Sequence, residues 1–356
     1  MSQMTRPPPL QLIVGPAGHG VARYAADLAG VLRRVDPRTP VVSVALVADA
    51  LPHARKASRS HLHVTNRLLG STPEEAAENL ERLASVTRLT ITVHDVPQAS
   101  DGTGLARRIA AYERFLAAAQ AAVVNSRHEQ ALVSEFLPAA PLPHAIPLGS
   151  QVAATPERPV PECTRERGSD GQRDLTVLLA GYIYPGKGHT AAIGAAAHAA
   201  EILRSAGEPV GHVRVRAIGG PSPGHERDVD ELRKHADSKG VLFEMTGFLS
   251  GEEFTRSMTG DGIPLAAHEH FSASRSMLDW VEAGRRPLVV SSRYAREMAE
   301  LRPGTIALYD PADLSRALAE AWGDSSHSWL AGGIPLTPTL ADAAAAYRAW
   351  WDDLAP

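Results

Sequence analysis

Three serines, Ser272, Ser274 and Ser276, stand at alternate positions between a short apolar run and a predicted helix. Their hydroxyls could cap that helix, and the unpaired N–H groups of a helix start make a natural anion site. Asp279 follows about one turn later, where a carboxylate could accept hydrogen bonds from the two hydroxyls of a ribose. A phosphate site followed by a ribose acceptor suits a nucleoside diphosphate. The alternative is a capped helix with an ion pair between Arg275 and Asp279 at i, i+4 spacing.

Lys187 lies in a glycine-containing turn that directly follows a predicted strand. Gly186 and Gly188 would let the backbone approach a ligand, and an ammonium at a helix start is well placed to pair with a diphosphate. Lysine is also rare here, because only four of the 36 basic residues are lysines. We therefore predict that Lys187 contacts a diphosphate; the alternative is a solvated surface lysine.

His94 and Asp95 stand where another buried strand is predicted to end. The carboxyl ends of parallel strands are where α/β folds bind their ligands. His94 could exchange a proton with a substrate or form a hydrogen bond to a sugar hydroxyl. The alternative is a histidine whose hydrogen bonds are satisfied by loop backbone.

Two pairs of histidines alternate along predicted strands, so the members of each pair face one side of the sheet. His61 and His63 form the first pair, and His268 and His270 form the second. Neither pair has a third ligand at a suitable spacing, and we predict no metal site.

The first predicted strand runs into a glycine turn that contains Gly18, His19 and Gly20. A strand, a glycine turn and a helix open a Rossmann-like unit, so these residues are candidates to contact a nucleotide or a sugar. Asn66 and Arg67 follow the first histidine pair and are candidates to line an interdomain cleft; a surface turn is the alternative.

Strands and helices alternate through the chain, which predicts two parallel sheets with helices on both faces. The boundaries that we predict are an N-terminal domain at 1–150, a linker at 151–173, a C-terminal domain at 174–328 and a final segment at 329–356. Predicted strands are 10–14, 41–47, 61–65, 89–94, 121–125, 145–148, 175–180, 213–218, 241–245, 263–267, 287–290 and 305–309. Predicted helices are 21–35, 73–85, 105–119, 127–137, 190–204, 225–236, 252–258, 277–283, 293–301, 314–322 and 340–354.

Composition excludes several classes of protein. At 356 residues and 44% hydrophobic residues the chain can bury two cores, and its net charge of −4 argues against a nucleic-acid partner. A single cysteine, Cys163, fits a reducing cytoplasm, and no apolar run reaches the roughly 18 residues of a membrane span. Neither a Gly-x-Ser-x-Gly turn nor a phosphate-binding P-loop is present. Arginines at 107, 108 and 114 would suit lipid contact, but we favour a solvated helix face.

Taken together, the motifs resemble family 4 retaining glycosyltransferases of the GT-B fold, which have two Rossmann-like domains facing a cleft. The resemblance covers nearly the whole chain, because 124–126 and 146–149 match the end of that family's first domain and the last helix matches one that crosses back onto it. It rests on the residues above and on a carboxylate, Asp279, that precedes the glycine of Ala-Gly-Arg-Arg-Pro by five residues.

This resemblance implies a nucleotide-sugar donor held mainly by the second domain and an acceptor held mainly by the first, with no cofactor and no metal. By position, Lys187 would contact the diphosphate and Asp279 the ribose, while Phe248 and Leu249 would contact the base. Gly18 and Gly20 would contact the sugar-phosphate, with the serines completing the donor site. His94 matches the family's active-site histidine, and His19, His63, Asn66, Arg67 and Asp95 are the acceptor or cleft candidates.

Two departures from the family pattern keep rival hypotheses open. Tyr182 stands where many relatives carry an arginine, and Phe271 with the serine turn stands where they carry glutamate followed by Gly-Phe-Gly. One rival is a non-hydrolysing nucleotide-sugar epimerase. The other is a catalytically silent nucleotide-sugar-binding protein of the same fold.

Overall fold

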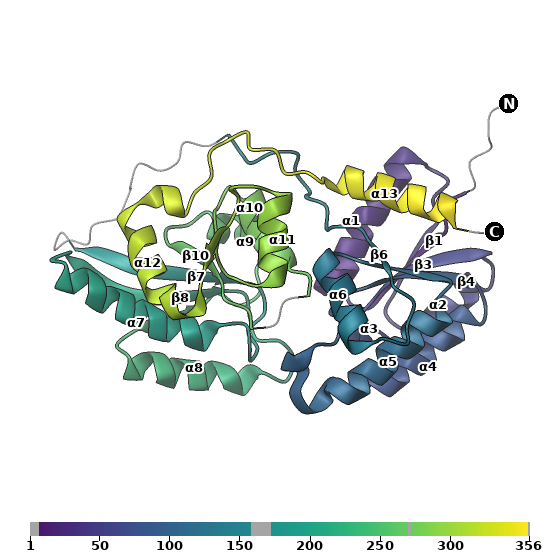
Figure 1. Ribbon diagram of the computed structural model, residues 1–356, viewed down its shortest axis with the longest axis horizontal. Coiled ribbons are helices and arrows are strands. Elements are labelled where there is room, and N and C mark those ends of the chain that lie inside the picture. The colour runs from purple at the N-terminus through teal and green to yellow at the C-terminus, as the bar shows by residue number, and fades with distance from the viewer. Residues whose placement is uncertain (1–6, 158–171, 270–271, 355–356) are drawn as a thin grey trace. The chain divides into compact units, whose positions relative to one another are not determined.

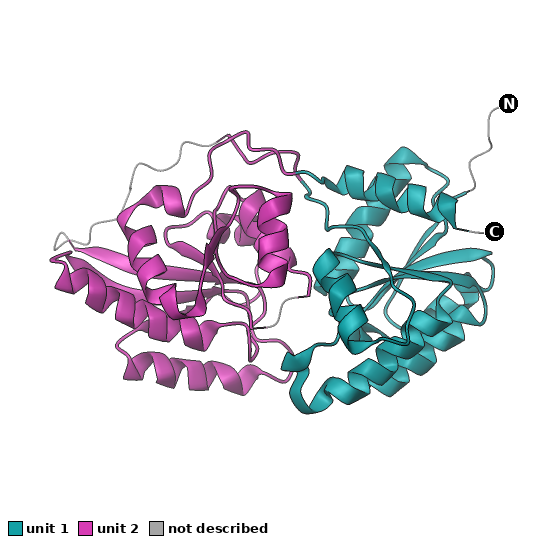
Figure 2. Cartoon of the chain, in the orientation of Figure 1, with its two compact units in different colours: residues 1–151, 337–356 teal, residues 152–336 magenta. Residues whose placement is uncertain are grey.

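The computed structural model describes residues 7–157, 172–269 and 272–354 (Figure 1). The chain forms two compact units, which Figure 2 shows in different colours. The first combines 1–151 with 337–356, and the second comprises 152–336. The C-terminal helix α13 (Leu340–Asp353) packs on α1 (Gly20–Val35) of the first unit, as predicted.

The first unit is built on a six-stranded parallel sheet in the order β2-β1-β3-β4-β5-β6. The order in which successive strands are added to this sheet reverses between β1 and β3, and ligands of doubly wound folds bind at such a reversal. The loops after β1 and β3 are therefore favoured positions for a site. The strands are β1 (Leu10–Val14), β2 (Val41–Val44), β3 (Arg59–Val64), β4 (Arg88–Val93), β5 (Ala121–Val124) and β6 (His144–Ala145).

The two faces of this sheet differ in chemistry. Strand residues such as Leu62, Val64 and Ile91 pack with α2, α4 and α5 in one apolar cluster. The opposite face carries His61 and His63 beneath α1 and α13. The remaining helical segments of the first unit are α2 (Val47–Ala54), α3 (Asn66–Leu69), α4 (Pro73–Ala84), the 3-10 segment at Ala99–Gly104, α5 (Leu105–Ala118) and α6 (Arg127–Phe136).

Most predicted elements of the first unit lie within two residues of the observed ones, but two predictions were wrong. The strand predicted at 41–47 ends at Val44, and Val47 begins helix α2. The apolar run continues there because Val47, Ala50, Leu51 and Ala54 are buried at helical spacing. The strand predicted at 145–148 is reduced to the two residues of β6.

The second unit is built on a six-stranded parallel sheet in the order β12-β11-β10-β7-β8-β9. This is the strand order of the doubly wound nucleotide-binding folds. The order in which successive strands are added reverses between β7 and β10. The loops that follow these two strands carry Lys187 and the serine turn. The strands are β7 (Arg173–Ala180), β8 (Val210–Ile218), β9 (Leu242–Met245), β10 (Ile263–Ala266), β11 (Leu288–Val290) and β12 (Ala307–Tyr309).

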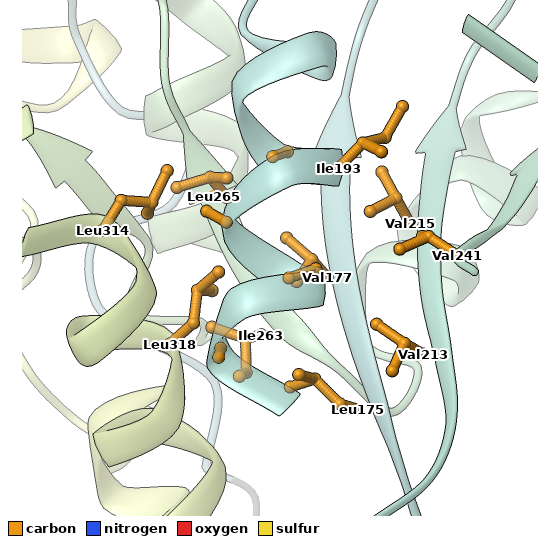
Figure 3. Packing of buried hydrophobic residues seen from close by; sticks show 14 of the residues in the cluster. Leu175, Val177, Ile193, Val213, Val215, Val241, Ile263, Leu265, Leu314 and Leu318 are labelled. Carbon is orange, nitrogen blue, oxygen red and sulfur yellow. The ribbon is translucent and has the colours of Figure 1, made fainter. Parts of the chain in front are cut away.

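The main core of the second unit lies between the sheet and helices α7, α8 and α12. Figure 3 shows Val177, Val215 and Leu265 of three neighbouring strands packed about helix α7, which carries Ile193, with Leu318 of α12 to one side. The opposite face is covered by shorter helices. Helices of this unit are α7 (His189–Ser205), α8 (Glu226–Ser238), α9 (Gly251–Met258), α10 (Arg275–Glu282), α11 (Arg293–Leu301) and α12 (Leu314–Gly323), with 3-10 segments at Pro311–Asp313 and Ser325–His327.

Candidate functional site

The strand ends of the first unit gather several of the predicted acceptor residues. His19 follows β1, Asn66 and Arg67 follow β3, and His94 and Asp95 follow β4. Burial and the charge of Arg67 lower the pKa of His19, and Asp95 opposes them, so the three side chains are close enough to interact. The structure therefore brings these candidates to the same edge of the sheet.

His19 also begins helix α1. Its Nδ1 accepts a hydrogen bond from the N–H of Val21 at 3.2 Å, which leaves the proton of a neutral ring on Nε2. The neighbouring glycines border open space, because a Cβ on Gly18 or Gly20 would meet no atom within 4 Å. The turn thus combines a hydrogen-bond donor with room for a ligand.

His94 lies in a buried polar layer between the sheet and α13. Its Nε2 is 3.0 Å from Nδ1 of His63, and its Nδ1 is 3.2 Å from the amide nitrogen of Asn125. Burial, followed by the nearby histidines His63 and His19, holds the pKa of His94 well below its usual value, against the opposing charge of Asp95. His94 is therefore a neutral imidazole at neutral pH.

His61 extends this layer toward the C-terminal helix. Its ring nitrogens lie 2.9 Å from Thr90 Oγ1 and 3.0 Å from Thr92 Oγ1, and Thr92 is 2.8 Å from the hydroxyl of Tyr347. Burial lowers the pKa of His61 to about 3. The pair predicted on β3 thus has neutral rings. His61 bonds to two threonines of β4, one of which bonds to Tyr347 of α13, and His63 bonds to His94 just after β4.

The backbone that carries His94 is held from helix α5. The hydroxyl of Tyr112 donates to the carbonyl oxygen of His94 at 3.2 Å. Asp95 has a φ of 58°, a left-handed conformation that is costly for a residue with a side chain. Arg108 donates to both the carbonyl and the carboxylate of Asp95, the latter at 2.9 Å, and so stabilises this turn.

The three arginines of α5 all form ion pairs. Each guanidinium meets a carboxylate: Arg107 with Glu74, Arg108 with Asp95 and Asp101, and Arg114 with Glu81. Such pairing offsets the positive charge that contact with anionic lipid would need. Among the described residues, no helix is both long and apolar enough to cross a membrane.

In the second unit, Lys187 is buried at the point where strand order reverses. Its ammonium lies 2.5 Å from Nε2 of His268, which follows β10, and donates to the hydroxyl of Ser276 at 3.1 Å. Burial lowers the pKa of Lys187 to about 7, while the carboxylate of Asp279 opposes the shift. The lysine is therefore not a solvated surface residue, and it lies near two residues of the serine turn and its helix.

Glycines give the Lys187 loop its path. Gly186 and Gly188 have φ values of 84° and 96°, where a side chain would be strained. A Cβ at Gly188 would also lie 2.3 Å from the carbonyl oxygen of Ala267, so the two loops approach each other closely. This approach places Lys187 beside His268.

The serine turn caps helix α10. Ser274 Oγ accepts from the N–H of Met277 at 3.3 Å, and its own N–H donates to the hydroxyl of Tyr294 at 3.0 Å. Ser272 is buried, and Ser276 turns toward Lys187. Gly284, with a φ of 75°, follows the helix in a left-handed conformation. His270 of the second histidine pair and Phe271 at the family's glutamate position lie outside the described residues.

The ion pair considered as an alternative for Asp279 is present. Arg275 Nε lies 2.8 Å from Asp279 Oδ1, and the same guanidinium bonds to Glu282. Both Arg275 and Asp279 have side chains that are about one-seventh exposed, at 14% and 16%. Asp279 is consequently held in place, at the same end of the sheet as Lys187.

Of the two residues predicted to contact the base, Phe248 is exposed and Leu249 is half-buried. Phe248 follows β9 and is 68% exposed, and its ring packs edge-on against Tyr182 with centroids 5.5 Å apart. Leu249 is half-buried against Trp280 and Met258 in a small apolar cluster. Tyr182, which stands at the arginine position of the resembling family, therefore contributes an aromatic surface in place of a cation.

Three residues of these sites were not assigned a role from sequence. From sequence, His268 is only a member of a histidine pair, Asn125 only part of a domain-end motif, and Arg108 only a basic residue of a helix face. Position at a strand end would have identified His268 and Asn125, because the same argument selected His94. Within 7–157, 172–269 and 272–354, no group of three or more His, Cys, Asp or Glu could hold a metal ion.

Known proteins resemble this chain in fold. No protein-family model matches the sequence, and no curated protein matches it. Among solved structures, Alr3699/HepE of Anabaena in complex with UDP-glucose aligns over 97% of this chain and 96% of its own, with a TM-score of 0.64 and 15% identity. Sucrose-phosphate synthase of Thermosynechococcus elongatus aligns over 96% and 95%, with a TM-score of 0.62 and 14% identity. These similarities confirm the predicted GT-B fold.

Proposed function

We propose that this protein is a glycosyltransferase that moves a sugar from a nucleoside diphosphate sugar to an acceptor hydroxyl. The observation that carries the proposal is the buried ammonium of Lys187, which lies beside a serine hydroxyl at the strand-order reversal of the second unit. A buried cation at such a point is suited to bind an anion. The Anabaena protein of the same fold binds UDP-glucose, so uridine diphosphate sugars are the first donors to test.

The donor diphosphate would lie against Lys187 and the start of helix α10. Its charge grows as the bond to the sugar breaks, so a cation and a helix start contribute most in the transition state. Asp279 would accept the ribose hydroxyls, with Arg275 fixing its orientation. Phe248 and Leu249 would contact the base.

The strand ends of the first unit would hold the acceptor and the transferred sugar. In the reaction, the acceptor oxygen forms a bond to the anomeric carbon on the face that the diphosphate leaves, and its proton passes to the departing diphosphate. This course retains the configuration. It needs no metal, because the ammonium and the helix start stabilise the leaving group.

The donor site is tested by nucleotide binding. UDP, GDP and ADP should be compared by thermal shift and calorimetry on wild type and on Lys187→Ala. We expect stabilisation by one of them and a loss of at least tenfold in affinity for the variant. The matched control is Lys234→Ala, which removes a lysine of helix α8 outside the candidate site. Folded wild-type protein that binds none of the three nucleotides would contradict the proposal.

Turnover separates the rival activities. With a UDP-sugar and no acceptor, a transferase releases UDP slowly by hydrolysis and leaves the remaining sugar unchanged, whereas an epimerase produces its isomer. A silent binding protein binds the nucleotide and gives neither product. Product stereochemistry, read by NMR after a reactive acceptor has been found, tests retention.

A further inference from the structure

Both ring nitrogens of His94 are engaged by side chains of the first unit. His63 lies 3.0 Å from Nε2, and Asn125 lies 3.2 Å from Nδ1. The three residues come from β3, the end of β4 and the end of β5, which are neighbours in the sheet. His94 as a whole residue is only 5% exposed, so these contacts set the orientation of its imidazole.

The direction of these hydrogen bonds follows from the surroundings of Asn125. Its amide nitrogen Nδ2 is 3.4 Å from the carbonyl oxygen of Val93 and 3.2 Å from His94 Nδ1. A carbonyl oxygen only accepts, so the amide must turn its nitrogen toward it. The same nitrogen then donates to His94, and His94 Nδ1 is an acceptor.

The position of the proton on His94 determines that on His63. A neutral imidazole carries one N–H, so His94 carries it on Nε2 and donates to Nδ1 of His63. His63 in turn carries its proton on Nε2, a buried atom with no hydrogen-bond partner in the structure. Asn125, His94 and His63 therefore form a relay with a single direction.

The relay excludes a charged ring. A second proton on His94 would face the amide hydrogens of Asn125 across Nδ1, which places two donors together in a buried site. The lone pair of His94 Nδ1 accepts from Asn125, so it does not take a proton from the hydroxyl of the acceptor substrate. The ring can instead donate its Nε2–H, which His63 Nδ1 accepts in this structure.

We propose that Asn125 and His63 are positioning residues that hold His94 as a neutral, Nε2-protonated imidazole, ready to donate to a hydroxyl of the transferred sugar. The reason to assign them to the reaction rests on the proposed function, in which the strand ends of the first unit, where His94 lies, hold that sugar. A sugar oxygen replaces His63 Nδ1 as the acceptor of the Nε2–H. His63 thus keeps the donor protonated and aimed while the sugar is absent, which is the preorganisation that hydrogen-bond catalysis needs.

The tautomer can be measured without any substrate. Histidine labelled with nitrogen-15 at both ring positions reports by NMR which nitrogen carries the proton, and the His94 signals are those lost in His94→Asn. We expect Nε2 protonated and Nδ1 unprotonated at pH 7. In Asn125→Asp, the carboxylate accepts at Nδ1 and should move the proton there. A protonated Nδ1 in wild type would overturn the proposal.

Activity tests the role of His63 through two variants. The Oδ1 of asparagine can stand near the position of His63 Nδ1 and accept from His94, whereas leucine cannot. We expect His63→Asn to keep kcat within about threefold and His63→Leu to lose at least tenfold in kcat with little change in KM for the nucleotide sugar. His61→Leu, which removes a ring beside His63 but no hydrogen bond of the relay, should keep the His94 tautomer.

These results separate this proposal from the proposed function. Equal kcat for folded His63→Asn and His63→Leu would overturn the positioning role, and far-ultraviolet circular dichroism shows whether both variants fold. If wild type transfers no sugar, the proposed function fails, and with it the positioning role in catalysis. The NMR measurement then still decides whether Asn125 and His63 fix the tautomer.

Discussion

Arg275 Nε lies 2.8 Å from Asp279 Oδ1, so the carboxylate predicted to bind a ribose is already held by an ion pair within its own helix. The two interpretations of this stretch are therefore compatible. A carboxylate has two oxygens with about four acceptor positions, so a carboxylate in an ion pair can also accept hydrogen bonds from hydroxyls. Because Arg275 also bonds to Glu282, the helix fixes where Asp279 can point.

Replacing Asp279 should weaken nucleotide binding more than replacing Glu282. Asp279→Asn keeps the shape but loses the charged acceptor, and a hydrogen bond to a charged group contributes about 1.5–3 kcal/mol, or roughly tenfold to 150-fold in affinity. Glu282→Gln removes the other partner of Arg275 and is the control. Calorimetric titration with the bound nucleoside diphosphate measures both. An equal loss in the two variants would indicate that only the packing of the helix matters.

Nucleotide affinity should fall as pH rises above about 7. Burial lowers the pKa of Lys187 to about 7, so the ammonium that a diphosphate needs is present below this pH and is lost above it. Binding must then restore the proton, which costs up to about tenfold in affinity per pH unit. Titrations at pH 6.5, 7.5 and 8.5 should show this decline. His268, Ser276 and Asp279 face the ammonium, and none of them supplies a second fixed positive charge at high pH.

Lys187→Arg is the matched control for that dependence. A guanidinium stays charged through this range, so the variant should bind with an affinity that changes little between pH 6.5 and 8.5. Its absolute affinity can be lower, because the planar group fits the pocket differently. A variant as pH-dependent as wild type would show that another group titrates.

Mild acid should destabilise the first unit. The pKa values of His61, His63 and His94 are lowered in the folded state, chiefly by burial, so below pH 6.5 the unfolded chain binds protons that the folded chain does not. Stability is complete above pH 6.5 and falls as pH decreases. At pH 5.5 the loss is about 1.4 kcal/mol per histidine, or on the order of 4 kcal/mol for the three.

Urea denaturation at pH 7.5 and 5.5 measures this loss, and hydrogen exchange of peptides from β3 and β4 assigns it to the first unit. His61→Phe removes one titrating ring, so the stability that the variant loses between the two pH values should be smaller by about 1.4 kcal/mol. Unchanged stability between the two pH values would mean that these histidines bind protons in the folded protein.

Position in a βα unit made part of the site predictable. Lys187 lies in the loop that follows a strand and His94 comes directly after one, and the sequence shows both strands and their ends through apolar residues followed by glycine or a polar pair. Asp279 could be placed because helical spacing relates it to Ser276 and Gly284. These inferences need only local periodicity and a fold class.

Contacts between segments distant in the chain could not be predicted in the same way. The bond between Lys187 and His268 joins two loops 81 residues apart, and it depends on the pairing of β7 with β10. Helix α2 was missed because Val47 continues an apolar run and Pro52 lies within the helix. Tertiary packing decides such cases, since either local conformation could bury the same residues.

Phe248 should contribute to nucleotide binding at little expense to stability. Its side chain is 68% exposed and packs edge-on with Tyr182, so removal opens no cavity in the core. Stacking of an aromatic ring on a base contributes about 1–3 kcal/mol, and Phe248→Ala should weaken UDP binding by roughly fivefold to 150-fold. Phe248→Trp should retain affinity, because it keeps a flat aromatic surface.

The control ligand is pyrophosphate, which has no ribose and no base. Its binding needs Lys187 but no base contact, so its affinity should be unchanged in Phe248→Ala. Equal weakening of UDP and pyrophosphate would instead show that the substitution distorts the diphosphate site, since the ring covers Gly220 so closely that an added Cβ there would lie 3.0 Å from it.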